Sequence, residues 1–247
     1  MRMRKKKHGT ERLDACREFL IENIEEPMLD PAKALDMPGS EVWLEIGAGK
    51  GGFAAKMAKN NPEVAYIAME KVTDCIVLAA EGAKRAFEGE RANLKFINDT
   101  ADNLTKIFNT GTISRIFLNF SDPWSKKGYA KRRLTHERYL SVYFNLLKDG
   151  GKLRFKTDNV GLFDFSLEET QKMGLTPDVV TRDLHASSYN EGNVMTEYET
   201  AFSSQGIKIN MLEITKPEGF SPEIPEDLSR DRKTYHVRLQ VRDFPLP

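Results

Sequence analysis

Short apolar runs alternate with longer amphipathic segments along most of this chain, and this alternation restricts the fold more than any other feature. Seven runs are predicted strands: Val42–Ile46, Val64–Glu70, Leu94–Asn98, Arg115–Phe120, Lys152–Thr157, Asp178–Asp183 and Lys208–Thr215. Five segments have the periodicity of helices: Gly52–Asn60, Val72–Phe87, Asp102–Phe108, Thr135–Leu147 and Leu162–Met173. Strands that alternate with helices predict an α/β fold, with a mostly parallel sheet covered by helices on both faces.

The two ends of the chain are predicted to lie outside that sheet. We expect a basic N-terminal arm with a leading helix, then an α/β domain, then a C-terminal extension, over residues 1–40, 41–216 and 217–247. The leading helix is expected over Glu11–Ile24. In the extension, the proline- and charge-rich stretch Pro217–Arg232 predicts an irregular loop, and the alternation over Thr234–Val241 predicts one more edge strand.

The length and composition indicate one globular domain with additions at its ends. Of the 247 residues, 40% are apolar and 30% are charged. No apolar run approaches the roughly 20 residues that cross a bilayer. The only cysteines, Cys16 and Cys75, have no metal-ligand spacing and do not suit a disulfide framework. We therefore expect a cytoplasmic protein with reduced thiols, no membrane association and no metal.

The charged residues are balanced in number but not in position. The formal net charge is zero, with 37 basic and 37 acidic residues, yet basic residues cluster at Arg2–Lys7 and at Lys126–Arg133. Each cluster alone is more often a solvated surface than a binding site. Because exposed charges act over about a Debye length, such local clusters still allow a nucleic-acid partner.

A glycine-rich loop follows the first predicted strand. Gly47, Gly49 and Gly52 match the spacing G-x-G-x-x-G and open the next helix, which suits a nucleoside-containing ligand bound across the strand ends. The match is weak alone, because a nicotinamide or flavin dinucleotide would fit it equally. Glu70 ends the second strand, where a carboxylate can accept both ribose hydroxyls of either kind of cofactor.

An acid inside the first strand bears on the choice of cofactor. Glu45 lies just before the loop, where the pyrophosphate of a dinucleotide would meet negative charge. S-adenosylmethionine has no phosphate and carries an ammonium and a sulfonium, which a nearby acid stabilises. A buried acid with only a structural role would be costly, so the sequence favours S-adenosylmethionine, bound by Glu45, Gly47, Gly49 and Glu70.

The loop after the fourth predicted strand is the most informative segment. It runs from Asn119 to Arg133, reads NFSDPWSKKGYAKRR, and emerges at the carboxyl edge of the sheet beside the glycine loop. Trp124 can stack on a base, and cations can hold the phosphates around it. The cations are Lys126, Lys127, Lys131, Arg132 and Arg133. Each residue alone has a structural explanation, but their combination with Asp122 in one loop indicates an RNA substrate.

Four segments together resemble the bacterial tRNA (guanine-N7)-methyltransferase family. They are LEIGAGKGGF, NFSDPWSKKGYAKRRLTH, LRFKTDN over Leu153–Asn159 and GNVMTEYE over Gly192–Glu199. The similarity covers roughly Val42 to Ile209, and the basic arm also fits. The resemblance implies a Rossmann-like class I methyltransferase fold with a mostly parallel seven-stranded sheet. It also implies methyl transfer from S-adenosylmethionine to guanine N7 in tRNA, at position 46 of the variable loop.

The resemblance further implies roles for particular residues. Glu45, Glu70 and Asp122 would contact the cofactor, and Asp122 would also be catalytic. Contacts to the guanine or its nucleotide are implied for Lys126, Asp158, Thr196, Glu197, Tyr198 and Glu199. Contacts to RNA are implied for Gly128, Lys131, Arg132 and Arg133.

Two features depart from the family pattern. The family usually has an acid immediately before the alanine that matches Ala101, and this chain has Thr100. Either Asp99 or the hydroxyl of Thr100 is therefore expected at the adenine, and the sequence leaves this choice open. The extension after Thr215 exceeds the usual family ending, and the sequence assigns it no function.

Methyl transfer to guanine N7 requires few catalytic groups from the enzyme. N7 carries a lone pair and no proton, so it can attack the methyl group in line without a general base. We assign Asp122 to positioning near the reacting ring. One carboxylate can accept both N1–H and the N2 amino group of guanine, and the candidates are Asp158, Glu197 and Glu199. His185 is expected to be structural.

Other functions would require different residues at these positions. Glu45 disfavours a nicotinamide-dependent oxidoreductase. The intact acidic and glycine positions disfavour a non-catalytic RNA-binding module. A methyltransferase that acts on amino groups would also place Asn and Pro after the fourth strand, but it would not need so many cations there. tRNA is the expected partner, and the sequence does not distinguish a monomer from a homodimer.

Overall fold

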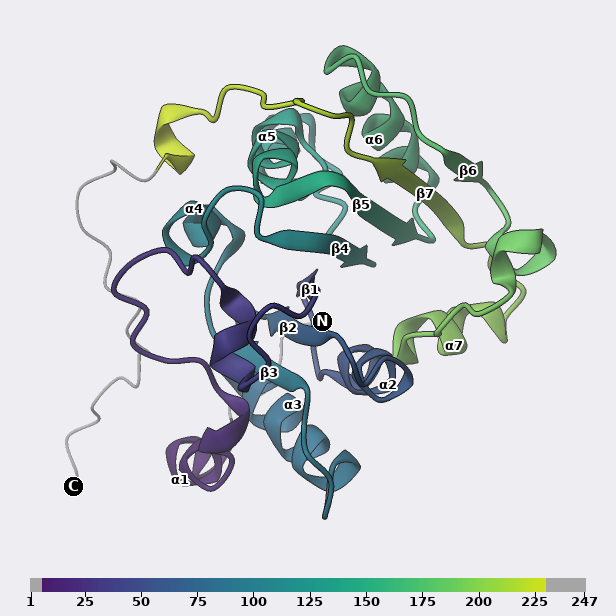
Figure 1. The fold of residues 1–247 in the computed structure, drawn as a ribbon. Coiled ribbons are helices and arrows are strands. Elements are labelled where there is room, and N and C mark those ends of the chain that lie inside the picture. Colours follow the sequence, from purple (N-terminus) through teal and green to yellow (C-terminus); the bar gives the residue numbers. More distant parts are fainter. Residues whose placement is uncertain (1–5, 230–247) are drawn as a thin grey trace.

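A seven-stranded sheet forms the centre of the computed structural model, which describes residues 6–229. The strands are β1 Val42–Ile46, β2 Ala65–Met69, β3 Leu94–Ile97, β4 Ile113–Asn119, β5 Leu147–Thr157, β6 Val179–Thr181 and β7 Asn210–Thr215. Their spatial order is β3-β2-β1-β4-β5-β7-β6 (Figure 1). β7 runs antiparallel to β5 and β6, and the other pairings are parallel. The predicted mostly parallel sheet of seven strands is confirmed.

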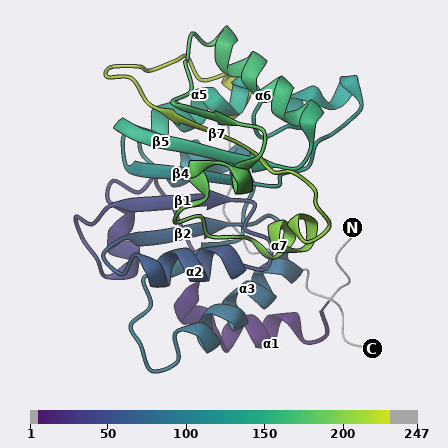
Figure 2. The ribbon, with the colours of Figure 1, turned by 90° about the vertical axis from the view of Figure 1, so that its right-hand side faces the viewer.

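Helices cover both faces of this sheet, as Figure 2 shows. They are α1 Gly9–Asp14, α2 Gly52–Asn60, α3 Thr73–Ala86, α4 Leu104–Ile107, α5 Glu137–Leu146, α6 Val160–Lys172 and α7 Glu197–Ser203. Residues of α1, α2 and α3 belong to one hydrophobic cluster, and residues of α4, α5 and α6 belong to the other. The two clusters lie on opposite faces of the sheet, which makes both faces apolar.

The side chains of β1 show how the sheet separates these clusters. All five residues of β1 are buried, but Leu44 and Ile46 belong to one cluster and Trp43 belongs to the other, because side chains alternate along a strand. Glu45 therefore shares a face with Trp43 and lies beside Phe117, its partner in β4. A charged side chain in this position sits inside the core.

The prediction of a leading helix over Glu11–Ile24 is wrong. Helix α1 ends at Asp14, and a single turn of 3-10 helix follows over Arg17–Phe19. The chain then extends so that Leu20 forms a bridge with Phe96 of β3, and the backbone N–H of Ile21 donates to the Phe96 carbonyl. Tertiary pairing with the sheet edge overrides the helical pattern of this segment.

Other predicted bounds differ by a few residues. β5 begins at Leu147 rather than Lys152, and the helix expected over Asp102–Phe108 is a 3-10 turn followed by the short α4. Helix α7 was not predicted. It lies beside α2, where the Lys50 and Glu197 side chains approach to 3.9 Å (Figures 1 and 2). The predicted strand over Thr234–Val241 lies outside the described residues.

The segment after β7 crosses back over α5 toward α4 (Figure 1). It is irregular apart from a 3-10 turn over Glu226–Leu228, in agreement with the predicted loop. Within residues 6–229, no helix has the length and apolar character needed to cross a membrane.

Candidate active site

A cavity of about 700 Å³ lies at the carboxyl ends of the central strands. Its walls come from the loops that follow β1, β2, β3 and β4. It is lined by five of the residues that the sequence assigns to the cofactor, namely Gly47, Glu70, Asp99, Thr100 and Asp122. This volume is typical of small-molecule and cofactor sites.

A second cavity of about 720 Å³ lies on the face of the sheet that α2 covers. It is lined by Arg115, Lys152 and Arg154, but Lys152 and Arg154 are already paired with Glu213 at 2.9 and 2.7 Å. It does not include the strand ends where the loops converge, so we assign the chemistry to the first cavity.

The glycine loop after β1 is fastened to β2. The N–H groups of Gly47 and Ala48 donate to the Met69 carbonyl at 2.8 and 3.0 Å, and Gly49 N–H donates to Glu70 Oε2 at 3.0 Å. Of the two glycines that end the loop, the backbone conformation requires a glycine at Gly51 and not at Gly52. Gly51 has a φ of 74°, and a Cβ there would lie 2.8 Å from the Cβ of Ala79.

Glu45 is almost completely buried, with 2% of its surface exposed. Its Oε1 accepts a hydrogen bond from Nδ2 of Asn119 at 2.9 Å, and Asn119 lines the cavity. Its Oε2 is buried and has no partner among the described residues. Burial raises the pKa of Glu45 to about 7. The free buried oxygen fits the ammonium group of an amino-acid ligand, which would satisfy the acceptor and favour the ionised acid.

The loop after β3 offers a second buried acceptor. Oδ1 of Asp99 accepts from the backbone N–H of Thr100 at 2.6 Å and from Nδ2 of Asn103 at 2.7 Å. Oδ2 of Asp99 is buried and unpaired within residues 6–229. The Thr100 hydroxyl is 3.5 Å from Oδ2 of Asp102. Both Asp99 and Thr100 line the cavity, and Asp99 holds the stronger free acceptor.

The loop after β4 has a strained backbone. Phe120 and Trp124 have positive φ angles of 51° and 41°, which non-glycine residues seldom adopt. Asp122 lies between them, is exposed and lines the cavity. Its carboxylate has no hydrogen bond or ion pair with any other described residue. The strained loop thus presents to the cavity a carboxylate that has no partner among residues 6–229.

The basic side chains of this loop fall into two groups. Arg133 is turned inward, because its guanidinium donates to the Pro123 and Trp124 carbonyls at 3.0 and 3.2 Å. This geometry does not fit the predicted RNA contact for Arg133, which instead holds the loop from within. Arg132 lies over both Trp124 and Tyr129, with its guanidinium carbon 5.1 and 4.6 Å from the ring centroids.

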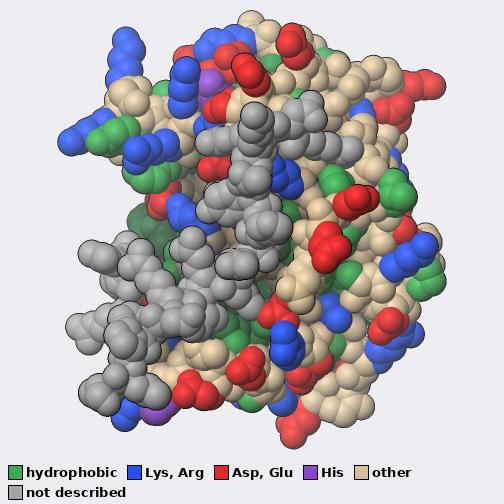
Figure 3. All heavy atoms as spheres, turned by 90° about the vertical axis from the view of Figure 1, so that its left-hand side faces the viewer, with side chains coloured by type: hydrophobic (Ala, Val, Ile, Leu, Met, Phe, Trp, Pro, Cys, Tyr) green, Lys and Arg blue, Asp and Glu red, His purple; other side chains and the backbone are tan. Residues whose placement is uncertain are grey.

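The remaining predicted RNA residues are exposed. Gly128 and Lys131 lie in a 3-10 helix over Lys127–Arg132, and their surfaces are open to solvent. Lys126, which was predicted to contact the guanine or its nucleotide, precedes that helix and is also exposed. On the face drawn in Figure 3, a group of Lys and Arg side chains projects together at the upper left. A chain of zero net charge can therefore still present local positive charge to a phosphate backbone.

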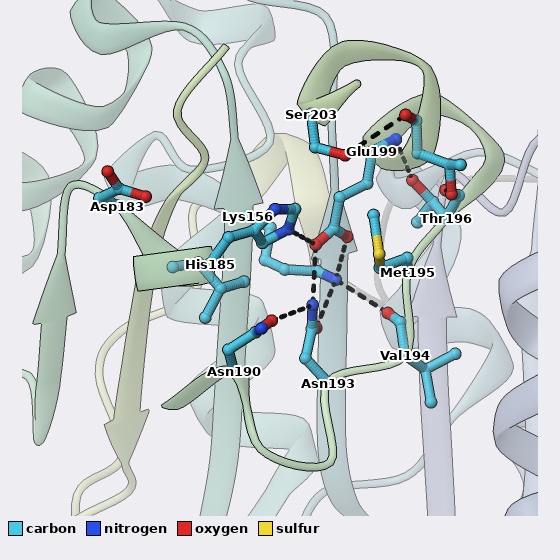
Figure 4. A network of polar contacts seen from close by, with 12 residues as sticks. Lys156, Asp183, His185, Asn190, Asn193, Val194, Met195, Thr196, Glu199 and Ser203 are labelled. Atoms are coloured by element: carbon cyan, nitrogen blue, oxygen red, sulfur yellow. Dashed lines mark hydrogen bonds and ion pairs between the residues drawn. The ribbon is translucent and has the colours of Figure 1, made fainter. Parts of the chain in front are cut away.

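Glu199 forms the centre of a buried polar network (Figure 4). Its Oε2 accepts from Lys156 Nζ at 2.6 Å, and its Oε1 lies 2.9 Å from His185 Nε2 and accepts from Asn193 Nδ2 at 2.8 Å. Lys156 also donates to Asn193 Oδ1 and the Val194 carbonyl, each at 3.1 Å. Burial would raise the pKa of Glu199, but the Lys156 charge and these hydrogen bonds together lower it.

This network changes the interpretation of Glu199. Its side chain is fully buried, and both oxygens are already bonded, so the predicted guanine contact does not fit this geometry. The expectation that His185 is structural agrees with its contact to Glu199. The sequence did offer a sign of this network, because Lys156 interrupts the apolar pattern of a central strand.

The other predicted guanine residues surround the N-terminus of α7. Thr196 caps the helix by accepting from Glu199 N–H at 2.9 Å, while Glu197 is exposed above the glycine loop. Tyr198 is 48% exposed and stacks on Phe202, and its ring centroid lies 5.2 Å from that of Phe120. Burial and the nearby charge of Asp158 raise the pKa of Tyr198. Phe120 was missed at the level of sequence, because only the fold brings it to Tyr198.

Comparison with known proteins adds to this geometry. A family model described as "Putative methyltransferase" matches residues 40–212. The tRNA (guanine-N(7)-)-methyltransferase of Bacillus cytotoxicus is 43% identical over 213 residues, which cover 86% of this chain and 96% of that protein. The chain belongs to the tRNA (guanine-N7)-methyltransferase family. It is an S-adenosylmethionine-dependent methyltransferase. The unpaired buried oxygens of Asp99, which lines the cavity, and of Glu45, which is bonded to the cavity residue Asn119, fit that cofactor.

Solved structures support the fold of this methyltransferase. An antibiotic-related methyltransferase superposes with a TM-score of 0.54 at 16% identity, covering 79% of this chain and 98% of that chain. The 16S rRNA methyltransferase KamB superposes with a TM-score of 0.54 at 13% identity, covering 87% of this chain and 96% of that chain. With the strand order, these matches confirm the predicted class I methyltransferase fold.

Proposed function

We propose that this methyltransferase transfers the methyl group of S-adenosylmethionine to N7 of a guanine in tRNA, at position 46 of the variable loop. One observation carries the proposal. The cofactor cavity opens onto the strained loop after β4, which presents Asp122 to the cavity and exposed cations to solvent. The specificity in the name of the 43% identical relative agrees with it.

Two of the proposed cofactor residues, Glu45 and Asp99, have a buried oxygen without a partner among residues 6–229. Glu45 would bind the ammonium of the methionine part through its unpaired Oε2. Gly47 and Gly49 would let the ligand approach the backbone. Glu70 lines the cavity, and its oxygens, which already accept from the Gly49 and Val72 N–H groups, would accept the ribose hydroxyls with their remaining lone pairs. Of the two residues left open at the adenine, we propose Asp99 as the main acceptor, with Thr100 lining the same wall.

The reaction needs alignment rather than proton transfer. Bound S-adenosylmethionine supplies a methyl group activated by its sulfonium. Guanine N7 has no proton to lose, so no residue has to act as a general base. Asp122 would hold the purine in line with the methyl group, and its negative charge would favour the positive charge that develops on the ring.

The residues around α7 would recognise the guanine base. Asp158 and Glu197 are the remaining candidates to accept N1–H and the N2 amino group, because the oxygens of Glu199 are bonded within the protein. The exposed ring of Tyr198, supported by Phe120, would stack on the base, and Thr196 and Lys126 would contact its nucleotide. Glu199 would act by holding this segment on the sheet.

The RNA around the target base would lie on the exposed basic loop. Gly128, Lys131 and Arg132 remain in this role, and Arg133 does not. The three-part division of the chain at residues 40 and 216, the choice between monomer and homodimer and the cytoplasmic location remain predictions. Size-exclusion chromatography with light scattering would determine the oligomeric state.

A labelling experiment tests the proposal directly. The full-length protein is incubated with unmodified tRNA and methyl-labelled S-adenosylmethionine, and the labelled nucleoside is identified by mass spectrometry and mapped by sequencing. We expect 7-methylguanosine at position 46. Another methylated nucleoside would overturn the base assignment, and 7-methylguanosine at another position would overturn the site assignment.

A further inference from the structure

The segment of residues 217–229 lies beyond the region that the family model matches, yet it is firmly attached to the methyltransferase domain. Leu228 is 1% exposed, and its carbonyl accepts from the Thr105 hydroxyl at 2.6 Å. The Pro222 carbonyl accepts from Nδ2 of Asn145 at 2.7 Å. These contacts fix the segment across α4 and α5 rather than leaving it in solvent.

This attachment brings an acid of the segment to the cofactor cavity. Asp227 lines the cavity together with Arg138 of α5, and the two side chains form an ion pair. The neighbouring Leu228 is the buried anchor, so the position of Asp227 is set by packing. Arg138 and Asp227 therefore form a fifth wall of the cavity, in addition to the loops that follow β1, β2, β3 and β4.

Arg138 links this fifth wall to two others. Its Nη1 donates to the Lys131 carbonyl in the basic loop at 3.2 Å, and its Nη2 lies 3.9 Å from Oδ1 of Asp102 after β3. The same Asp102 oxygen accepts from the Tyr139 hydroxyl at 2.8 Å. With only 18% of its side chain exposed, Arg138 is held between three segments that all line the cavity.

The place of this cluster in the cavity indicates its role. Glu70 lies at the end of β2, where the ribose is expected, and Asp99 to Asp102 follow β3 on the far side of it. Arg138 and Asp227 therefore close the end of the cavity that would hold the adenine. Among residues 6–229, Asp102 is the other carboxylate within 4 Å of the Arg138 guanidinium, and it is also the acceptor of the Tyr139 hydroxyl.

We propose that Asp227 is a positioning residue of the cofactor site, which acts through Arg138 to hold the adenine end of the cavity in shape. The C-terminal extension would thus contribute to the affinity for S-adenosylmethionine in this chain. The inference rests on the proposed placement of the cofactor, but it does not depend on which base of the tRNA receives the methyl group.

The test uses the full-length protein and its Asp227→Asn variant. Isothermal titration measures the Kd of S-adenosylmethionine, and of adenosine as a probe that lacks the methionine part. We expect both Kd values to rise about threefold to tenfold in the variant, because a held ion pair of modest strength is lost. The Tm of the ligand-free protein and the Kd of tRNA should stay at their wild-type values.

Two further variants separate this role from a general effect. Glu226→Gln removes a neighbouring acid that does not line the cavity, and it should bind both ligands as the wild type does. Asp227→Glu keeps the charge and should restore part of the affinity. Wild-type affinity in Asp227→Asn, or equal weakening in Glu226→Gln, would overturn the proposal. A labelled product other than 7-methylguanosine would overturn the proposed function and leave these binding results unaffected.

Discussion

Glu45 is an acid inside a central strand, and its protonation should control cofactor binding. Burial raises its pKa to about 7, while only the ionised carboxylate attracts an ammonium strongly. As the pH falls from about 7.5 to 5.5, the ionised fraction drops, so we expect the Kd of S-adenosylmethionine to rise on the order of tenfold. Titration calorimetry over this range measures the effect.

The matched control is Glu45→Gln. It keeps an acceptor for the Asn119 amide but cannot ionise. We expect weak binding of S-adenosylmethionine at every pH, without the rise in Kd below pH 7. A variant with the same pH dependence as the wild type would show that another group is responsible.

Asp122 should matter for the reaction far more than for binding. It is exposed in the cavity and has no partner among residues 6–229, so its removal costs the fold little. For Asp122→Ala we expect kcat to fall about a hundredfold or more, as when a charge-stabilising group is lost, with the Kd of tRNA within about twofold. Methylation at the wild-type rate would contradict the assignment.

At the scale of elements, the loop after β4 divides its cations between two tasks. Lys126 and Lys131 are exposed, whereas Arg133 holds the Pro123 and Trp124 carbonyls. We expect Lys126→Ala with Lys131→Ala to weaken tRNA binding and reduce the slope of log K against log salt by roughly 1 to 2. Fluorescence anisotropy at several salt concentrations measures that slope.

Two single variants complete this comparison. Lys33→Ala removes an exposed charge from the 3-10 helix Pro31–Leu35, away from the loop, and should leave the slope unchanged. Arg133→Ala should lower kcat through the displaced loop, with a smaller change of slope than the double variant. A slope that falls equally in all three proteins would remove the loop from the RNA surface.

The α7 segment depends on one buried ion pair. Lys156→Met would leave the Glu199 carboxylate fully buried without its ammonium partner, so we expect the free energy of unfolding to fall by roughly 3 to 5 kcal/mol. Adding Glu199→Met removes the unpaired buried carboxylate and should restore part of the lost free energy of unfolding. Urea unfolding of the two variants measures this, and a double variant less stable than the single one would contradict it.

At the scale of the whole molecule, Glu45 should make stability depend on pH. Its pKa is about 7 when folded and 4.5 by reference, so between these values the folded protein binds more protons than the unfolded chain. The free energy of unfolding therefore falls as pH rises through this window. Glu45→Gln has no carboxylate to ionise in the core, so it should be more stable than the wild type by roughly 3 kcal/mol at pH 8 and by less than about 0.5 kcal/mol near pH 4.5.

Urea unfolding of both proteins at several pH values tests this difference. A gap between wild type and Glu45→Gln that does not change with pH would mean that Glu45 is not a buried titrating group. A variant that is less stable at pH 8 and loses S-adenosylmethionine binding would mean that the carboxylate mainly holds Asn119 in place.

The amino-acid sequence alone determined the sheet, the cofactor loop and the class of chemistry. Short apolar runs and period-3.6 patterns are local properties, and the apolar runs located all seven strands to within a few residues. The glycines and Glu45 could be assigned because they belong to one strand–loop–helix unit, and Glu70 because it ends the next strand. The loop after β4 was informative for the same reason, since its acid, aromatic ring and cations are neighbours in the chain.

Only the tertiary structure decided which of these side chains are free. Arg133 and Glu199 look like binding residues in the sequence, but Pro123, Trp124 and Lys156 already hold them. The approach of Tyr198 to Phe120, and the C-terminal segment against the cavity, also join distant parts of the chain. Whether a side chain can contact a ligand depends on its burial and on partners that are distant in the chain. The spacing of residues along the sequence encodes neither. The sequence thus specified the kinds of groups at the site, and packing specified which of them can reach a ligand.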